Sequence, residues 1–259
     1  HLHQIMIPHS QWAKALHQSA RTQKPRDQFS TQHTYTLDDA YTVQHALIQE
    51  RVQEGHTIIG VKMGFTSVAK MKQMGVEDMI IGQLTEDMRI TSKAPLVRSK
   101  CIHPRAEPEI AFRLSQDITS PLSVNEVSSV VDGVASAIEV IDSRYENFKF
   151  SLEDVVADNC SSCGFTLGPW CQVPLGLNGL DMVQTFNHTI VAEGTSDAIL
   201  DNPFEALAAA TRLAHQYGLP LKKGMIVLAG AATAAHFIGA SENVEVTVDG
   251  LGSANFEVV

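Results

Sequence analysis

The chain has 259 residues, enough for one or two domains with a substantial buried core. Its 19 Lys and Arg against 29 Asp and Glu give a formal net charge of −10, which argues against nucleic acid or an anionic membrane surface as a partner. Four cysteines are too few for a disulfide framework, and no apolar run has the length of a signal peptide or a membrane span. We therefore expect a reduced, cytoplasmic protein.

Helical periodicity dominates the first part of the chain. Apolar residues recur at helical spacing over residues 38–54, and Gly55 ends this predicted helix. Residues 58–63 form a short apolar run that is typical of a strand. Thr66 is the expected N-cap of a small helix over residues 67–74.

Strands and turns prevail in the remainder of the chain. The capping-box pattern of Ser123–Glu126 predicts the start of a helix, and residues 133–141 predict a strand. A further helix is expected over residues 202–218, and the alternation of valines over residues 244–248 predicts a terminal hairpin. The whole pattern predicts an α+β protein with a helical N-terminal region over residues 1–55 and a β-rich catalytic core over residues 56–259.

Three glutamates are the strongest candidates for chemistry. Glu107 and Glu109 are residues i and i+2 of a predicted strand, so their carboxylates project from the same face. Such a pair alone is more often a solvated strand face. Glu139 changes this balance because its neighbours on the strand face are apolar, where an unpaired carboxylate is unfavourable. Three carboxylates in this setting suit Mg²⁺ or Mn²⁺; the alternative is a buried acid paired with Arg105 or Arg144.

Other residues carry weaker signals. Lys62 lies at the end of a predicted strand, where it could bind an anion or transfer a proton if its pKa were lowered, although a lysine reaching to solvent is commoner there. Cys160 and Cys163 form a C-x-x-C pair with no second pair at zinc-finger spacing, and we interpret them as ordinary buried thiols. His103 and His236 are interpreted as packing or hydrogen-bonding residues.

From about Gly60 to Phe256 the chain resembles the fumarylacetoacetate-hydrolase superfamily. The resemblance rests on VKMGFTS (61–67), HPRAEPEI (103–110), AIEVIDSR (137–144), VADN (156–159) and GLGSANF (250–256), in that order. It implies a mixed core of twisted β-roll or sandwich type and a metal, Mg²⁺ or Mn²⁺, held by Glu107, Glu109 and Glu139. It also implies catalytic roles for Lys62, which matches the active-site lysine of the family, and for Ser161, which matches a serine of the loop after VADN.

Within this superfamily the chain is similar to the branch of 2-oxopent-4-enoate hydratases and 4-oxalocrotonate decarboxylases. Hydratases of this branch carry an aspartate in a Pro-Asp-Phe-Gly stretch, and Ile80 takes its place here. This departure, with the DSRYENFKF segment at 142–150, favours a metal-dependent decarboxylase (a lyase) acting on 2-oxohex-3-enedioate in aromatic-compound catabolism. We then expect Lys62, Ile80 and Arg144 to bind the substrate, with Arg105 as the alternative arginine.

Two other functions stay open on the sequence. A hydratase of 2-hydroxypenta-2,4-dienoate would need Asp78 to stand in for the missing acid. A non-catalytic protein that stabilises a partner enzyme would have no need to bury three carboxylates and Lys62. The resemblance also implies a homo-oligomer and a possible complex with the pathway hydratase, and the expected ligand is a small 2-oxo dicarboxylate.

Overall fold

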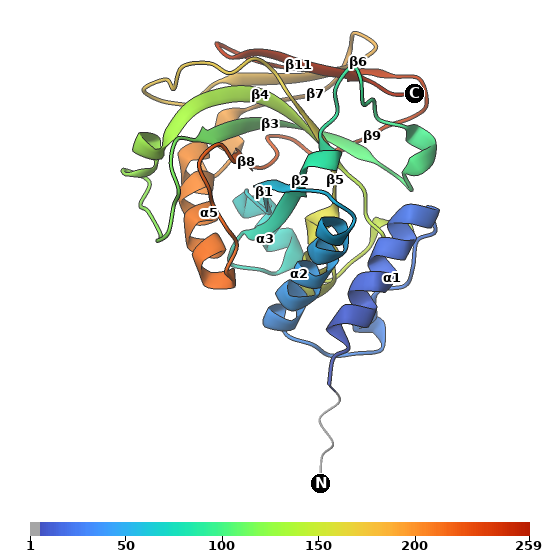
Figure 1. Cartoon of the computed structure of the whole chain (residues 1–259). Coiled ribbons are helices and arrows are strands. Elements are labelled where there is room, and N and C mark those ends of the chain that lie inside the picture. The colour runs from blue at the N-terminus through green and yellow to red at the C-terminus, as the bar shows by residue number, and fades with distance from the viewer. Residues whose placement is uncertain (1–5) are drawn as a thin grey trace.

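The computed structural model describes residues 6–259 and contains two β-sheets flanked by helices (Figure 1). Residues 1–5 of the predicted N-terminal region lie outside the described part. The helices are α1 (His9–Thr22), α2 (Leu37–Gln53), α3 (Val68–Met74), α4 (Leu152–Ala157) and α5 (Pro203–Tyr217). The strands are β1 (Ile58–Gly64), β2 (Ile80–Thr85), β3 (Arg105–Leu114), β4 (Val131–Ile141), β5 (Ser162–Leu167), β6 (Asp181–Phe186), β7 (Thr189–Thr195), β8 (Ile226–Leu228), β9 (His236–Phe237), β10 (Asn243–Val248) and β11 (Gly252–Glu257). The predicted α+β class is confirmed.

The larger sheet is rolled. Its strands run in the order β2-β1-β8-β3-β4-β5, with β9 paired to β3, and the smaller sheet has the order β11-β10-β6-β7. In a flat sheet β1 and β4 would be about 14 Å apart, three strand spacings, which is more than a lysine and a glutamate can span. Lys62 on β1 nevertheless lies 2.9 Å from Glu139 on β4, measured from Nζ to Oε2. The roll therefore brings side chains of non-adjacent strands together in one interior.

The loop between α4 and β5 holds the two edges of the rolled sheet together. The side chain of Asn159 accepts a hydrogen bond from the backbone N–H of Gln83 on β2 at 2.8 Å and donates one to the Gln83 carbonyl at 2.8 Å. Because β5 begins only a few residues later, at Ser162, this exchange ties one edge strand to the start of the other.

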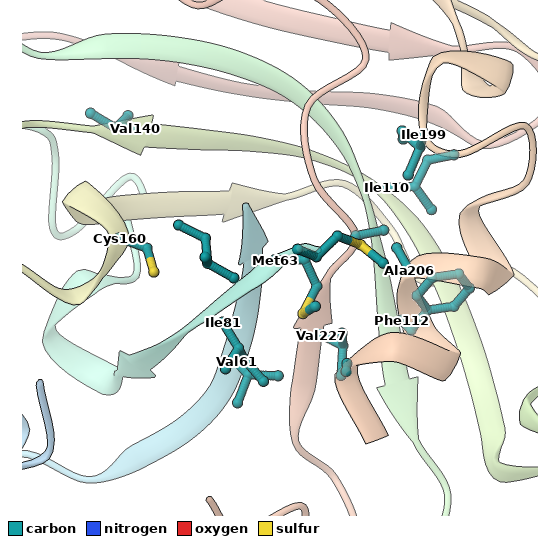
Figure 2. Close-up of a cluster of buried hydrophobic side chains, with 14 of the residues drawn as sticks. Val61, Met63, Ile81, Ile110, Phe112, Val140, Cys160, Ile199, Ala206 and Val227 are labelled. Carbon is teal, nitrogen blue, oxygen red and sulfur yellow. The ribbon is translucent and has the colours of Figure 1, made fainter. Parts of the chain in front are cut away.

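Alternation along the strands places apolar core side chains on one face of the larger sheet and polar side chains on the other. Figure 2 shows Val61 and Met63 of β1, Ile110 and Phe112 of β3 and Val140 of β4 among the buried apolar side chains of the core. Successive strand residues point to opposite faces. Lys62, Glu107, Glu109 and Glu139 occupy the other parity on the same three strands, so they project from the face opposite to this core.

The N-terminal helices join the same hydrophobic core as the sheet. Trp12 of α1 and Leu47 of α2 belong to the buried cluster that includes Val61 and Ile110. Helix α2 begins at a capping box, in which the Thr36 hydroxyl accepts from the backbone N–H of Asp39 and the Asp39 carboxylate accepts from the N–H of Thr36. The predicted helix over residues 38–54 is thus confirmed to within one residue at each end. The division into residues 1–55 and 56–259 stays a prediction.

Two predicted helix starts are wrong in detail. The backbone N–H of Ser123 donates to the Glu126 carboxylate, and the N–H of Glu126 donates to the Ser123 carbonyl. These bonds lead only into a 3₁₀ turn, Val127–Val130, because the valines and serines there are poor helix formers. The N-cap of α3 is Ser67, whose hydroxyl accepts from Lys70, and not Thr66. Thr66 is instead buried against Gly230.

None of the helices described over residues 6–259 is long and apolar enough to cross a membrane.

Candidate active site and metal centre

The structure brings the three predicted glutamates together. Antiparallel pairing of β3 and β4 places Glu107 directly opposite Glu139, and Glu109 follows two residues along the same face. One carboxylate oxygen of each residue lies within 4.8 Å of those of the other two. All three side chains are buried, and Glu109 is fully shielded from solvent. This cluster is called the carboxylate triad below.

The triad has hydrogen-bonding capacity that the described residues leave unused. Glu109 Oε1 accepts a hydrogen bond from the backbone N–H of Gly230 at 3.0 Å, whereas Glu109 Oε2 and Glu139 Oε1 are buried with no hydrogen-bond partner in the described part of the chain. Burial, followed by repulsion from the neighbouring carboxylates, raises the pKa of Glu109 well above its usual range. Burial also raises the pKa of Glu139, although Lys62 opposes this. Orphaned, converging carboxylate oxygens fit a hard divalent cation with oxygen ligands.

Lys62 is a buried cation next to the triad. Its ammonium lies 2.9 Å from Glu139 Oε2 and donates a hydrogen bond to the Cys160 carbonyl at 2.7 Å. Burial disfavours the charged form, but the surrounding carboxylates, Glu139 foremost, outweigh it and raise the pKa of Lys62 above its usual value. The lowered pKa considered from the sequence is therefore not found, and the ion pair with Glu139 favours the ammonium form of Lys62.

Ser161 belongs to a strained segment at the edge of the site. Asn159, Cys160 and Ser161 have φ angles of 50°, 54° and 58°, a left-handed conformation that is unfavourable by roughly 1–2 kcal/mol per non-glycine residue. Strain of this kind persists where the surroundings fix the backbone, and functional sites are common examples. The Ser161 hydroxyl is buried, lines a cavity and has no hydrogen-bond partner among residues 6–259. It is thus available to a ligand.

A cavity of about 520 Å³ opens onto these groups, a volume typical of small-molecule sites. Of the residues named from the sequence, five line it: Lys62, Ile80, Arg105, Glu107 and Ser161. Glu109 and Glu139 lie deeper and adjoin Glu107. The other lining residues include apolar, aromatic and basic side chains and one amide: Gln28, Met63, Phe65, Lys70, Met74, Ile141, Phe148, Lys149, Phe150 and Val155.

Arg144, predicted to bind the substrate, lies outside this cavity. Its guanidinium is buried and donates to Asp158 Oδ1 at 2.6 Å and to the carbonyls of Asp158 and Ser162 at 2.8 Å each. It does not line the cavity, because the ion pair with Asp158 turns it toward the loop that carries Ser161. Arg144 therefore supports the strained segment.

Arg105 is the arginine that reaches the cavity. Its guanidinium carbon lies 4.0 Å from the centroid of the Phe148 ring, a stacking arrangement that orients the charge. No carboxylate of the described residues lies within ion-pair distance of Arg105. Its charge is thus available to an anionic ligand.

Asp78, considered from the sequence as a stand-in for the missing acid of the hydratases, lies outside the cavity. Strand β2 begins only at Ile80, and the Asp78 carboxylate forms two hydrogen bonds of 2.9 Å with Arg212 of α5. The side chain is half-exposed and does not line the cavity, whereas Ile80 does. The wall of the cavity at this point is apolar.

Sequence reasoning missed two contributors to the site. Gly230 donates its N–H to Glu109, and a Cβ at this position would lie 2.2 Å from Thr66 Oγ1. A glycine at the end of a strand, within a run of small residues, is the signal that could have indicated this close approach. Lys70 of α3 lies 3.6 Å from Glu107, measured from Nζ to Oε2, and its sequence position gives no comparable signal.

Comparison with known proteins gives consistent matches over nearly the whole chain. The family described as Fumarylacetoacetate (FAA) hydrolase C-terminal matches residues 57–259. A 4-oxalocrotonate decarboxylase of Pseudomonas sp. is 43% identical over 247 residues, which cover 95% of this chain and 96% of that one. A 2-keto-4-pentenoate hydratase of Paraburkholderia xenovorans is 31% identical over 255 residues, covering 95% and 93%.

A solved structure also matches over nearly the whole chain. The 4-oxalocrotonate decarboxylase from Pseudomonas putida G7, complexed with magnesium and adipate, has a TM-score of 0.93 at 31% identity, covering 99% of this chain and 100% of that chain. The predicted resemblance and the fold that it implies are thereby confirmed. On the family match over residues 57–259 and on these identities, the chain belongs to the fumarylacetoacetate hydrolase family.

Proposed function

We propose that this protein is a metal-dependent lyase that decarboxylates 2-oxohex-3-enedioate (4-oxalocrotonate) to 2-oxopent-4-enoate and CO₂ in the catabolism of aromatic compounds. The observation that carries the proposal is a single cavity lined by Lys62, by Glu107 of the triad and by Ile80 at the position of the hydratase aspartate. The identities support it, at 43% with a decarboxylase and 31% with a hydratase. Adipate, found in the similar magnesium complex, is a saturated dicarboxylate of the same length as this substrate.

The chemistry requires stabilisation of negative charge far from the bond that breaks. In 2-oxohex-3-enedioate the C6 carboxylate is linked to the C2 ketone through the C3=C4 double bond. When the C5–C6 bond breaks, CO₂ leaves and the electron pair shifts through the conjugated carbons onto the C2 oxygen. A proton taken up at C3 then gives 2-oxopent-4-enoate. The barrier is therefore lowered by groups that stabilise a developing enolate.

The triad is the proposed metal site, with Glu107, Glu109 and Glu139 as ligands. Their all-oxygen donor set suits Mg²⁺ or Mn²⁺, either of which supplies Lewis-acid stabilisation of the enolate oxygen when bound. Lys62, held between Glu139 and the Cys160 carbonyl, offsets part of the triad's charge and presents a cation to the C1 carboxylate or the C2 oxygen. The unpaired Ser161 hydroxyl is placed to donate a hydrogen bond to the same end of the substrate.

The remaining cavity residues are assigned to the other end of the substrate. Arg105 binds the C6 carboxylate and orients it, so that the C5–C6 bond aligns with the conjugated system. Ile80 leaves no acid to activate water beside C4 and C5, which disfavours hydration. Self-association and a complex with the pathway hydratase stay predictions.

The test is CO₂ release from 2-oxohex-3-enedioate by the purified protein, with Mg²⁺, with Mn²⁺ and after chelation. We expect release that stops on chelation and returns with either ion. Hydration of 2-hydroxypenta-2,4-dienoate by folded, metal-loaded protein, without CO₂ release from the dicarboxylate, would contradict the proposal and establish the hydratase. The absence of both activities would favour the non-catalytic role.

A further inference from the structure

A second group of metal-ligating side chains lies apart from the carboxylate triad. Ligand atoms of Cys101, Asp142 and Cys163 all lie within 4.8 Å of one another. These residues come from three segments: the end of the 3₁₀ turn Arg98–Lys100, the residue after β4 and the second residue of β5. Cys101 and Asp142 are buried and Cys163 is partly exposed, so Cys163 is not the ordinary buried thiol expected from the C-x-x-C spacing. Cys160, its partner in that spacing, belongs to the hydrophobic core.

We propose that Cys101, Asp142 and Cys163 form a second metal site, which takes a thiolate-preferring divalent cation such as Zn²⁺. Two sulfur ligands distinguish this donor set from the all-oxygen triad, because Zn²⁺ prefers sulfur and nitrogen ligands and Mg²⁺ prefers oxygen. Ligand atoms on a tetrahedral zinc lie about 3.3–3.8 Å apart, given bonds of about 2.0–2.3 Å. The observed spread of at most 4.8 Å closes to this range with small side-chain rotations.

Backbone hydrogen bonds orient the Asp142 carboxylate of this second site. Asp142 accepts hydrogen bonds from the backbone N–H of Ile102 at 2.8 Å and of His103 at 2.9 Å, one on each oxygen. Each oxygen keeps a further lone pair, and ligands fixed by hydrogen bonds of this kind are typical of metal sites in proteins. The same bonds hold the backbone immediately after Cys101 against Asp142. Two of the three ligands are thus fixed relative to each other.

The electrostatic surroundings allow a cation here. Basic residues line the cavity at the second site, and two of them are neutralised by ion pairs, Arg51 with Asp87 and Arg144 with Asp158. Two thiolates and one carboxylate carry three negative charges against two on the metal, so binding leaves a local charge of about −1. Arg89 and Lys100, which also line the cavity, offset this remaining charge.

Solvent reaches the second site from its own cavity. Cys101, Asp142 and Cys163 line a cavity of about 280 Å³, together with residues such as Arg89 and Lys100. None of its lining residues also lines the 520 Å³ cavity of the active site. The second site thus has an entry path and room for a water molecule as fourth ligand, independent of the substrate.

The second site adjoins the strained segment of the active site. The backbone N–H of Asp142 donates to the Ser161 carbonyl at 2.8 Å, and Cys163 follows Ser161 by two residues. A cation bound to Asp142 and Cys163 would fix the chain on the C-terminal side of Asn159–Ser161. We therefore assign the proposed cation a structural role.

The test uses Co²⁺ as a spectroscopic probe on the full-length, reduced, Mg²⁺-loaded protein. Thiolate ligands give cobalt an intense sulfur-to-metal charge-transfer band in the near ultraviolet, and the oxygen-only triad cannot produce it. We expect this band to saturate at one equivalent, to disappear on adding Zn²⁺, and to be absent from Cys101→Ser and Cys163→Ser. Glu107→Gln, which disables the triad, should keep the band. Cys171→Ser should keep it too, because Cys171 lies elsewhere, against the carbonyls of Pro169 and Leu251.

A further variant keeps the test decisive if the serine variants fail to fold. Asp142→Asn retains both sulfurs, and we expect the band with at least about tenfold weaker affinity for Co²⁺. The proposal is overturned if the wild-type protein shows no band or if the band survives in folded Cys101→Ser. It is also overturned if Cys101 and Cys163 form a disulfide once metal and reductant are removed from the protein, as measured by thiol titration.

Discussion

Glu139 combines full burial, an orphaned oxygen and an ion pair with Lys62. The Glu139→Gln change preserves the shape of the side chain but removes a metal ligand and the closest counter-charge of Lys62. We expect Mg²⁺ affinity and CO₂ release each to fall by about 100-fold or more, since even residues that only support metal ligands change affinity by about 10–100-fold. Calorimetric titration with Mg²⁺ and the CO₂ assay measure the two effects.

A matched control for Glu139→Gln is Glu257→Gln, an exposed glutamate on β11. It makes the same chemical change on the surface, so metal affinity and turnover should stay at the wild-type level. If Glu139→Gln kept the wild-type affinity, Glu139 would not be a ligand.

The same substitution at two arginines is expected to change substrate binding at one and stability at the other. Arg105→Met removes a cavity-lining charge, and we expect KM for 2-oxohex-3-enedioate to rise about 10- to 150-fold, which corresponds to a charge-assisted hydrogen bond of about 1.5–3 kcal/mol. Arg144→Met leaves Asp158 buried and unpaired, and we expect the free energy of unfolding to fall by about 3–5 kcal/mol. Steady-state kinetics and urea unfolding of both variants check this. A loss of stability in Arg105→Met, with KM unchanged, would refute the assignment.

Individual residues were predictable where strand alternation alone decides their direction. Glu107 and Glu109 follow from i, i+2 spacing, and Glu139 from its apolar neighbours. Arg144 was not predictable, because its direction depends on an ion pair with Asp158 in a loop of left-handed residues. The direction of the Asp78 side chain was not predictable for a similar reason, since its partner Arg212 is distant in sequence and belongs to α5.

At the scale of secondary-structure elements, the turn after β8 decides how closely the chain can pass the triad. Gly230 has φ +103°, and an added Cβ would lie 2.2 Å from Thr66 Oγ1. We expect Gly230→Ala to lower the free energy of unfolding by about 1–3 kcal/mol from overpacking, beyond the cost of the positive φ. It should also lower CO₂ release, because the N–H bound to Glu109 must move.

The control for Gly230→Ala is Gly224→Ala. Gly224 also has a positive φ, +86°, but an added Cβ meets nothing within 4 Å. This variant should show only the backbone penalty of about 1–2 kcal/mol and unchanged turnover of the folded protein. Equal effects of the two variants on stability and turnover would mean that the contact with Thr66 is unimportant.

The capping box of α2 gives a pH-dependent expectation. The hydrogen bond from the Thr36 backbone, followed by that from His9, lowers the pKa of Asp39 in the folded protein. A lowered pKa of an acid contributes stability above the unfolded-state pKa, near 3.8, and this contribution is lost as pH falls through the folded-state value. The destabilisation caused by Asp39→Asn should therefore be larger at about pH 7 than at about pH 3 in urea unfolding.

Thr36→Ala should destabilise by about 1 kcal/mol at neutral pH.

At the scale of the whole molecule, the site depends on how the larger sheet rolls. The positions of the strands could be read from periodicity, but their order could not, because β1 pairs with β8 across more than half of the chain. The 2.9 Å contact of Lys62 with Glu139 joins β1 to β4, which are not neighbours in the sheet. Local sequence patterns do not encode such a contact. The family resemblance implied that Lys62 and the three glutamates belong to one active site, but not this contact.

Because the triad and Lys62 join three strands of this roll, cation binding should stabilise the entire fold. A ligand that binds only the folded protein adds about 2.7 kcal/mol at a concentration 100 times its Kd. For a chain of this size, that corresponds to a rise in Tm on the order of 5–10 °C. Scanning calorimetry with saturating Mg²⁺ and with chelator should show this difference in wild-type protein and in Cys101→Ser. The difference should be absent from Glu139→Gln. A Tm shift that persisted in Glu139→Gln would place the stabilising cation outside the triad.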